Sequence, residues 1–178
     1  AASRGFSTLL IEQDDFGKGT SSRSTKLLHG GVRYLAQGDL VMVIEALKER
    51  GLILKNAPHL TFNQEFVIPV YTIGDAIKYA IGLKFYDLLA GRLSLGKSRF
   101  INAAETLRRL PELRIKGLKG GVIYHDGQFD DSRLLIALIR TIFEKGGVAL
   151  NYCRATGLIK NDDGKLTGVI ALDLESGQ

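Results

Sequence analysis

The sequence predicts an α/β fold, α+β overall, and three parts of the chain lead to that prediction. Phe6 to Ile11 is a short apolar run typical of a buried strand. A helix is expected from Asp131 to about Lys145, and the apolar run Val148 to Tyr152 after it is expected to return as a parallel strand, giving a strand-helix-strand crossover. Ala155 to Ile159 and Leu166 to Leu174, separated by Asn-Asp-Asp-Gly, predict a hairpin.

The composition excludes some classes of protein and leaves others open. The chain has 178 residues, of which 45% are hydrophobic and 24% charged, so wholesale disorder is not expected. Its formal charge of +5 and its pI of about 9.4 favour anionic partners. Phosphate esters, acidic lipid headgroups and nucleic acid all fit, and the charge alone does not choose among them.

The single cysteine, Cys153, cannot form an internal disulfide, and we expect it to be a buried structural thiol. The sequence contains no apolar run of about 18 residues that would cross a membrane as one helix. No secretory signal peptide is recognisable either.

The first residues, Ala1 to Gly5, have the pattern of a helix end at which Gly5 stops the helix. Glu12 follows the first strand, at the place where the second strand of a dinucleotide-binding unit carries the acid that binds the ribose. The alternative for Glu12 is a solvated acid at a loop entrance. Because the sequence has no G-x-G-x-x-G, we expect the first strand and its glycine-rich turn upstream of Ala1, and a further strand after Gln178.

The segment from Gly17 to Leu35, GKGTSSRSTKLLHGGVRYL, has the highest density of chemically active groups in the chain. Backbone amides beside small hydroxyl side chains bind phosphate oxygens, and Arg23, Lys26 and Arg33 supply positive charge. The glycine pair after His29 lets the backbone approach a flat ligand closely. The segment therefore predicts a binding site for an anionic cofactor.

A helix is expected from Leu40 to Ala57, with Asp39 as its N-cap. The strand after it, Glu65 to Tyr71, contains Pro69, which suits a sheet edge or a strand end. The residues expected on the apolar face of the helix are Leu40, Val43, Ile44, Leu47 and Leu54.

The next helix, from Asp75 to Leu89, is apolar nearly all round. One interpretation is a helix buried between two layers. The other is a helix in a membrane interface, with Lys78, Lys84 and Arg92 near lipid phosphates.

Four shorter features follow this helix. We expect a basic loop from Gly91 to Arg99 and a short helix that begins at the capping box Asn102 to Glu105. A short strand, Val122 to Tyr124, is expected to end in a turn at His125 to Gln128, because Asp-Gly is typical of turns.

Several kinds of site lack support in the sequence. His29, His59 and His125 are widely separated, and neither C-x-x-C nor H-E-x-x-H occurs, so no metal site is expected. The absence of G-x-S-x-G argues against a serine nucleophile. The basic charge is not accompanied by a nucleic-acid-binding motif, and no nucleic-acid partner is expected.

The stretch from Thr20 to Leu35 closely resembles the signature of the FAD-dependent glycerol-3-phosphate dehydrogenase family, within the D-amino-acid-oxidase-like flavoproteins. The strand before Glu12, the Ala-Pro-His of Ala57 to His59, Tyr124 with Asp126 and Gly127, and the segment Asp130 to Leu134 support the resemblance. It covers all 178 residues and corresponds to the amino-proximal part of a family member.

This resemblance implies a fold and a division into domains. The fold would be part of a glutathione-reductase-like FAD-binding domain, with parallel strands and a β-meander, joined to part of a substrate domain. Residues 1–60 and 119–178 would belong to the FAD-binding domain, and residues 61–118 to the substrate or cap domain. Because the glycine-rich turn is missing, we expect the polypeptide as given to bind FAD weakly or not at all and to have no turnover.

The resemblance also implies roles for individual residues. Glu12 would bind the adenosine ribose, and the backbone at Ala155 would meet the adenine. Arg33 would hold the substrate phosphate, with Tyr34 as its companion, and Arg33 and His29 are the candidate catalytic residues. The other expected cofactor contacts, on the pyrophosphate and the flavin, are Thr20, Ser21, Ser22, Ser24, Lys26, Leu27, His29, Gly30 and Gly31.

The implied reaction is the oxidation of sn-glycerol 3-phosphate to dihydroxyacetone phosphate, with electrons passed to a quinone or oxygen. The implied location is the cytoplasm, with or without peripheral contact at the inner face of the cytoplasmic membrane. Two alternatives stay open. One is a flavin oxidase or dehydrogenase of an amino or hydroxy acid, and the other is a non-catalytic module that binds phosphate or lipid.

Overall fold

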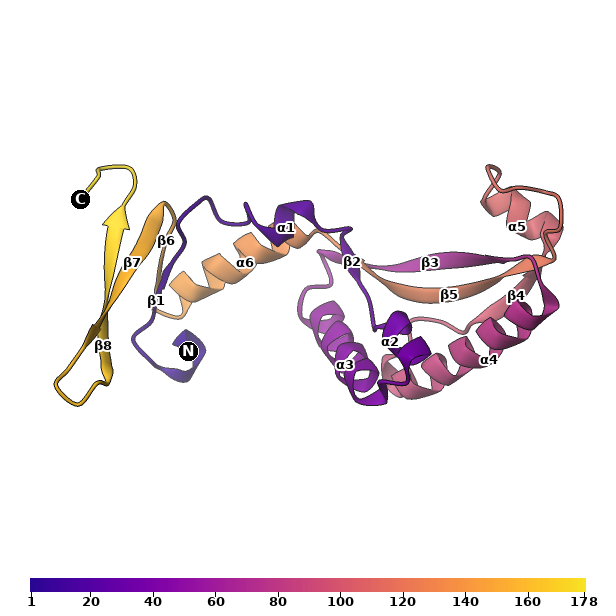
Figure 1. Ribbon diagram of the computed structural model, residues 1–178, viewed down its shortest axis with the longest axis horizontal. Helices are drawn as coiled ribbons and strands as arrows, with labels where there is room; N and C mark the ends of the chain where they lie inside the picture. The colour runs from indigo at the N-terminus through magenta and orange to yellow at the C-terminus, as the bar shows by residue number, and fades with distance from the viewer. The chain divides into compact units, whose positions relative to one another are not determined.

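The computed structural model describes the backbone of all 178 residues and every side chain except those of Arg33 and Ala36. The residues group into two compact units (Figure 1). We call residues 1–25 and 131–178 the terminal unit, and residues 26–130 the central unit. The domain boundaries expected at residues 60 and 118 stay a prediction.

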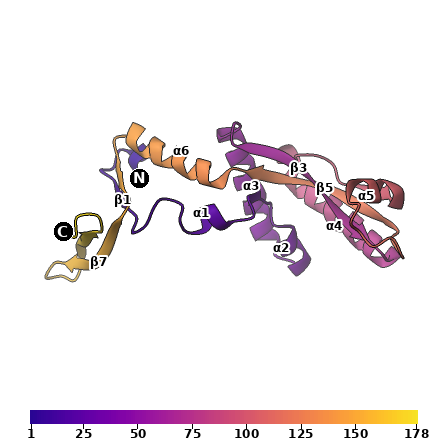
Figure 2. The ribbon, with the colours of Figure 1, turned by 90° about the horizontal axis from the view of Figure 1, so that it is seen from above.

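The terminal unit contains a parallel strand pair, one long helix and a hairpin (Figure 2). Gly5 ends the first short helix with a φ of 82°, as predicted. Gly164, with a φ of 75°, lies in the turn of the predicted hairpin, which is confirmed. The elements of this unit are η1 (Ala2–Arg4), β1 (Leu9–Ile11), α1 (Thr20–Arg23), α6 (Asp131–Glu144), β6 (Val148–Leu150), β7 (Cys153–Lys160) and β8 (Leu166–Asp173).

The parallel partner of β6 is β1, with Leu9 opposite Val148 and Ile11 opposite Leu150. The predicted strand-helix-strand crossover is therefore wrong in one respect. The strand before α6 belongs to an antiparallel sheet in the central unit, and β6 pairs instead with a strand from the start of the chain. The apolar pattern identifies both strands, but it carries no information about which strands pair.

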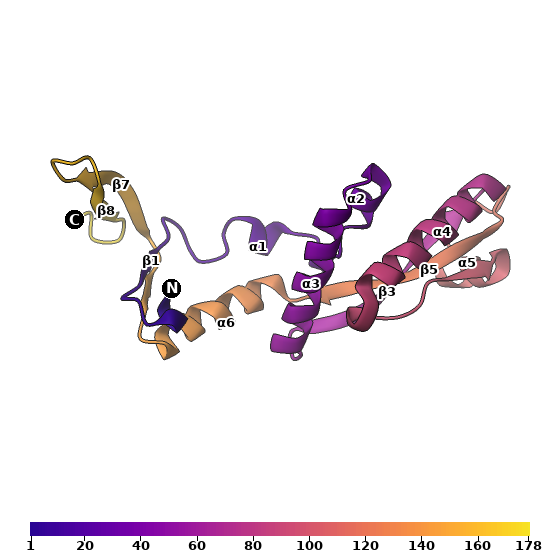
Figure 3. The same cartoon turned by 90° about the horizontal axis from the view of Figure 1, so that it is seen from below.

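The central unit is an antiparallel sheet with helices packed on it (Figure 3). Its middle strand, β5, pairs with β3 on one side and with β2 and β4 on the other. β3 is thus an edge strand of this sheet, which suits Pro69, as expected. The elements are β2 (Leu27–Leu28), α2 (Val32–Gln37), α3 (Leu40–Asn56), β3 (Thr61–Val70), α4 (Ile73–Ala90), η2 (Gly91–Leu93), β4 (Arg99–Asn102), α5 (Ala103–Arg109) and β5 (Gly120–Phe129).

The turn predicted at His125 to Gln128 is wrong, because β5 continues through it as a strand to Phe129. The strand persists because Asp126 is buried and forms an ion pair with Arg50 of α3. Gly127 lies against β2, where an added Cβ would come within 2.8 Å of the Leu28 carbonyl oxygen. An Asp-Gly pair therefore serves long-range contacts here instead of a local turn.

The helix α3 begins where it was predicted, and Asp39 accepts a hydrogen bond from the Met42 amide at 3.1 Å. Its apolar face is narrower than expected. Val43 and Leu47 are buried, whereas Leu40 and Ile44 are 40% and 49% exposed. The buried face instead includes Arg50, because that side chain is paired with Asp126.

The helix α4 buries one face only. Leu83 belongs to a buried cluster with Val70 and Val122 of the sheet, and Tyr86 belongs to another with Val43 and Leu47 of α3. Four apolar side chains on α4 are more than half exposed: Ile73, Ile77, Ile81 and Leu88. Within the described side chains, α4 is thus not enclosed between two layers, and no helix there is both long and apolar enough to cross a bilayer.

Candidate functional site

The loop that joins β2 to α2 carries His29, Gly30 and Gly31 in the central unit. The pairing of β2 with the end of β5 fixes where this loop begins. The His29 side chain is exposed, whereas Gly30 and Gly31 are buried. The imidazole of His29 is therefore accessible, while the backbone of the two residues after it is packed against the core.

The two glycines are required for different reasons. An added Cβ at Gly30 would overlap the Tyr86 hydroxyl oxygen and the Leu47 side chain, so the core leaves no room for a larger residue. Gly31 has a φ of 82°, in the left-handed region that favours glycine, and it precedes the first residue of α2. The expected close approach of a flavin to these glycines stays a prediction.

Beneath the loop lies the buried carboxylate of Asp126, which accepts hydrogen bonds from four groups. The Gly30 amide donates to it at 3.0 and 3.3 Å, and Arg50 Nη1 donates at 2.9 Å. The Tyr86 hydroxyl donates to Oδ2 at 3.3 Å, and the Gly127 amide donates to Oδ1 at 3.2 Å. Loop, helix and strand residues thus meet at one acceptor.

Asp126 and Arg50 form an ion pair whose side chains are 4% and 1% exposed. Arg50 also donates through Nη2 to the Leu93 carbonyl at 3.1 Å, and its guanidinium lies 5.8 Å from the centre of the Tyr86 ring. Burial raises the pKa of Tyr86 well above its usual value, and the Asp126 carboxylate raises it further. The Tyr86 hydroxyl therefore stays protonated and acts as a donor.

Two expected substrate contacts fall in α2. The side chain of Arg33 lies outside the described residues. Tyr34 is 37% exposed, and its amide donates to the Gly31 carbonyl at 2.9 Å. This bond ties the first turn of α2 to the glycine pair.

The acid expected to bind a ribose, Glu12, follows β1 in the terminal unit. Its amide donates to the Leu150 carbonyl at 2.9 Å, so it continues the parallel pairing. Its Oε1 accepts from the Asp14 amide at 3.0 Å. A carboxylate has several acceptor positions, so this local bond is compatible with a further hydroxyl partner.

The hydroxyl residues at the start of the candidate segment also belong to the terminal unit. Ser24 donates to Asp131 Oδ2 at 2.6 Å, and the Ser21 carbonyl accepts from the Ser132 hydroxyl at 3.1 Å. Ser21 and Ser24 are therefore both hydrogen-bonded to the first residues of α6. Thr20 opens α1, and Ser22 is exposed. Ala155 lies in β7 and is exposed.

A cavity of about 590 Å³ opens in the terminal unit beside these hydroxyl groups. Its lining includes Gly17, Lys18 and Ser22 from one segment, Ser132 from α6, and Tyr152, which follows β6. It thus combines a cation, hydroxyl groups and an aromatic ring next to the loop after β1.

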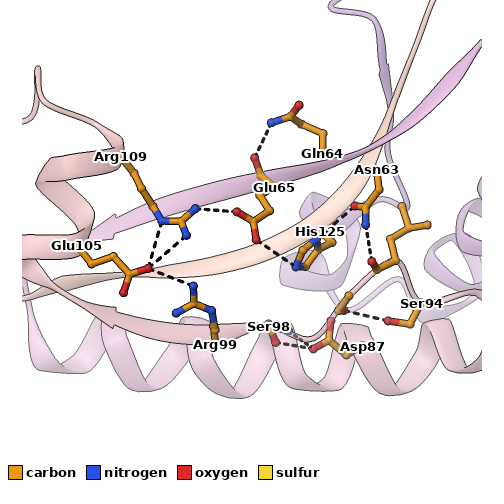
Figure 4. A network of polar contacts seen from close by, with 12 residues as sticks. Asn63, Gln64, Glu65, Asp87, Ser94, Ser98, Arg99, Glu105, Arg109 and His125 are labelled. Carbon is orange, nitrogen blue, oxygen red and sulfur yellow. Dashed lines mark hydrogen bonds and ion pairs between the residues drawn. The ribbon is translucent and has the colours of Figure 1, made fainter.

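A second polar cluster lies on the face of the central sheet that carries His125 (Figure 4). Arg109 donates to Glu65 at 2.7 Å, and Arg99 donates to Glu105 at 3.1 Å. His125 Nε2 lies 3.9 Å from Glu65 Oε1. Each arginine is matched by a carboxylate, so this cluster stabilises the sheet face and carries little net charge.

The sequence profile described as "FAD dependent oxidoreductase" matches residues 1–178. The chain belongs to this family.

Three proteins that are similar to this chain are glycerol-3-phosphate dehydrogenases. A probable mitochondrial enzyme of Caenorhabditis elegans is 44% identical over 99% of this chain, which spans 26% of that protein. The mitochondrial enzyme of Saccharomyces cerevisiae is 41% identical over 100% of this chain, which spans 29% of it. A solved glycerol-3-phosphate dehydrogenase of Bacillus halodurans complexed with FAD superposes with a TM-score of 0.69 and 34% identity, over 99% of this chain and 27% of that one.

Two features of the terminal unit are compatible with the cofactor named in the family's description, FAD. The parallel pair β1–β6 has Glu12 where a ribose-binding acid is expected, and the cavity next to it has cationic and hydroxyl groups. Among the described residues, no cluster of three or more His, Cys, Asp or Glu has an arrangement that would hold a metal ion.

Sequence reasoning missed the Arg50, Tyr86 and Asp126 cluster. The sequence of α3 indicated this cluster, because Arg50 follows Val43 and Leu47 at helical spacing and so lies on the same face of the helix, which is buried. A charged residue on an apolar stripe needs a buried partner, and that requirement would have pointed to an acid elsewhere in the chain.

Proposed function

We propose that the full-length protein carrying this chain oxidises sn-glycerol 3-phosphate to dihydroxyacetone phosphate with FAD. The observation that carries the proposal is the 44% identity with a glycerol-3-phosphate dehydrogenase across 99% of the chain. The exposed His29 on a loop held by the core is the chemical feature that supports it.

In this proposal, Arg33 pairs with the substrate phosphate, Tyr34 assists it, and His29 is positioned to accept the proton of the substrate hydroxyl. Glu12 binds the ribose. The remaining cofactor contacts are Thr20, Ser21, Ser22, Ser24, Lys26, Leu27, Gly30, Gly31 and Ala155. FAD held by these residues would supply the acceptor for a hydride from the substrate carbon.

The direct test measures reduction of a dye by the purified full-length protein with glycerol 3-phosphate, and separately with amino acids and 2-hydroxy acids. We expect activity with the phosphate ester alone. Activity only with an amino or hydroxy acid would replace this proposal with the alternative in the same family. A His29→Asn variant is expected to lower kcat by about 10²- to 10⁴-fold, the usual contribution of a general base.

The same proposal includes a quinone or oxygen as electron acceptor. Oxygen consumption, measured with and without a soluble quinone analogue, separates the two. Turnover that needs the quinone assigns the quinone, and turnover with hydrogen peroxide formation assigns oxygen.

We also propose a peripheral membrane location at the inner face of the cytoplasmic membrane, with α4 as the contact. The exposed Ile73, Ile77 and Ile81 support it, and Lys78 lies among them in the sequence. Sedimentation with vesicles of 30% anionic lipid is expected to bring down the wild-type protein and less of an Ile77→Ser, Ile81→Ser variant. Equal sedimentation of both would exclude α4, and saturable binding by a protein without flavin-dependent activity would favour a non-catalytic lipid-binding module.

A further inference from the structure

We infer that Asp126 is a positioning residue for the loop that carries His29, and that it acts through its hydrogen bond to the Gly30 amide. The inference rests on the proposed function for its effect on catalysis. Its structural part, the fixing of the loop by a buried carboxylate, stands on the geometry of the central unit.

The Gly30 amide donates to Asp126 directly beside His29 in the sequence. Gly30 follows His29 directly, and both of its amide contacts among the described residues go to the two oxygens of Asp126, at 3.0 and 3.3 Å. A side chain, and not a neighbouring backbone carbonyl, thus sets the direction of this peptide. A change at Asp126 is transmitted to His29 through one peptide bond.

The packing around Gly30 also restricts the position of the loop. Gly30 is also closed in by the Tyr86 hydroxyl and the Leu47 side chain, which an added Cβ would overlap. The loop therefore lies against both a buried acceptor and a packed wall. The hydrogen bond and the close packing together restrict the position of the backbone at Gly30.

The Asp126 carboxylate is itself held in place by hydrogen bonds. Arg50 binds Oδ1 at 2.9 Å and is held in turn by the Leu93 carbonyl at 3.1 Å, while the Tyr86 hydroxyl binds Oδ2 at 3.3 Å. Because Asp126 is 3% exposed and Arg50 is 1% exposed, water does not compete for these bonds. The carboxylate thus has a fixed position from which to hold the loop.

This support has a consequence for chemistry. A displacement of about 1 Å in a reacting group lowers the rate by about 10²-fold. Loss of the Asp126 contact is therefore expected to lower kcat far more than it raises KM, because the binding residues outside the loop are unchanged.

The test compares the wild-type full-length protein with Asp126→Asn, which keeps the side-chain volume and loses the charge. Fragment-resolved hydrogen exchange is expected to show the Gly30 amide exchanging at least about tenfold faster in the variant. With glycerol 3-phosphate, kcat is expected to fall by about 10- to 100-fold and KM to change by less than about threefold.

The matched control is Thr106→Val. Thr106 is fully buried against β5, and its hydroxyl donates to the Asn102 carbonyl at 2.8 Å, far along the strand from Asp126. The control is expected to lower the melting temperature without changing Gly30 exchange or kcat. The same fall in kcat in both variants would show a general loss of stability and overturn the inference.

Two further outcomes separate this inference from the proposed function. If the wild-type protein does not oxidise glycerol 3-phosphate, the proposed function fails while the exchange measurement still tests the positioning. If Asp126→Asn does not fold, hydrogen exchange of the Gly30 amide in the wild-type protein tests the inference. A Gly30 amide protected by about 10²-fold or more supports the inference, and exchange at the unprotected rate overturns it.

Discussion

At the scale of single residues, the packing behind a position decides which substitutions it tolerates. Gly30 faces Tyr86 and Leu47 without space for a methyl group, whereas an added Cβ at Gly82 in α4 meets nothing within 4 Å. The same change from glycine to alanine therefore has opposite consequences at the two positions.

Gly30→Ala is expected to destabilise the protein by about 1–3 kcal/mol, the usual cost of overpacking a core. Gly82→Ala is expected to stabilise it by about 0.5–1 kcal/mol, because alanine loses less backbone entropy in a helix. Melting temperatures of both variants check the pair. A Gly30→Ala protein as stable as the wild type would show that Tyr86 moves aside freely.

A second prediction at this scale concerns Glu65. The hydrogen bond from Arg109 lowers the pKa of Glu65 below its ordinary value of 4.5. A carboxyl whose pKa is lower in the folded state stabilises the fold fully above its unfolded pKa, and this stabilisation is lost as the pH falls through the folded pKa. Protonation of Glu65 is therefore expected to contribute to the loss of folding stability from about pH 4.5 downward.

Because Glu65 is 44% exposed, solvent screening limits its contribution to about 0.5 kcal/mol. Glu65→Gln is expected to lower the melting temperature slightly at pH 7 and to have a smaller effect at pH 3. Glu49→Gln, a change at an exposed glutamate of α3, serves as the control. Equal effects of Glu65→Gln at both pH values would contradict the assignment.

At the scale of elements, side chains just outside the helices determine where they begin. Asp39, Thr72 and Asn102 each accept a hydrogen bond from a backbone amide in the first turn of the helix that they precede. The caps at Asp39 and Asn102 were predicted from the sequence, because a capping bond joins residues three apart and needs no tertiary contact.

Removing one such cap should loosen its helix. Asn102 Oδ1 accepts from the Glu105 amide at 2.8 Å, so Asn102→Ala is expected to cost about 1 kcal/mol. Asn102→Asp keeps an acceptor and adds a negative charge at the helix start, and it should match or exceed the wild-type stability. Chemical denaturation of the three proteins measures the difference, and an Asn102→Ala protein with wild-type stability would mean that the cap is redundant.

The elements also show where sequence reasoning reaches its limit. α3, α6 and the β7–β8 hairpin follow from local spacing, capping and turn residues, and all three were predicted. The failure at His125 to Gln128 has a tertiary cause, since Asp126 pairs with Arg50 from another element. Likewise, the candidate loop was found from its composition, but its buried support was not, because the supporting residues are distant in sequence.

At the scale of the whole molecule, the central unit has its own core. Val43, Leu47, Tyr86 and Ala90 form one buried cluster, and Val70, Leu83 and Val122 form another. All of these residues lie within residues 26–130. The core of this unit is thus complete within one continuous stretch of chain.

A polypeptide of residues 26–130 is therefore expected to fold alone and to unfold cooperatively. Near-ultraviolet circular dichroism of its tyrosines, followed through a urea titration, checks this. The control is Val122→Asp in the same polypeptide, which places a charge in the second cluster and should abolish the transition. A broad transition in the unmodified polypeptide would mean that the unit depends on the rest of the chain.

The pairing of β1 with β6 also determines the order of events during synthesis. Leu9 emerges from the ribosome while its partner Val148 has not been made, and the whole central unit is translated between them. At about 5–20 residues per second, the nascent strand β1 waits on the order of ten seconds before the backbone of β6 is available to pair with it. The strand order itself therefore makes the β1–β6 pairing one of the last contacts of the terminal unit to form during synthesis.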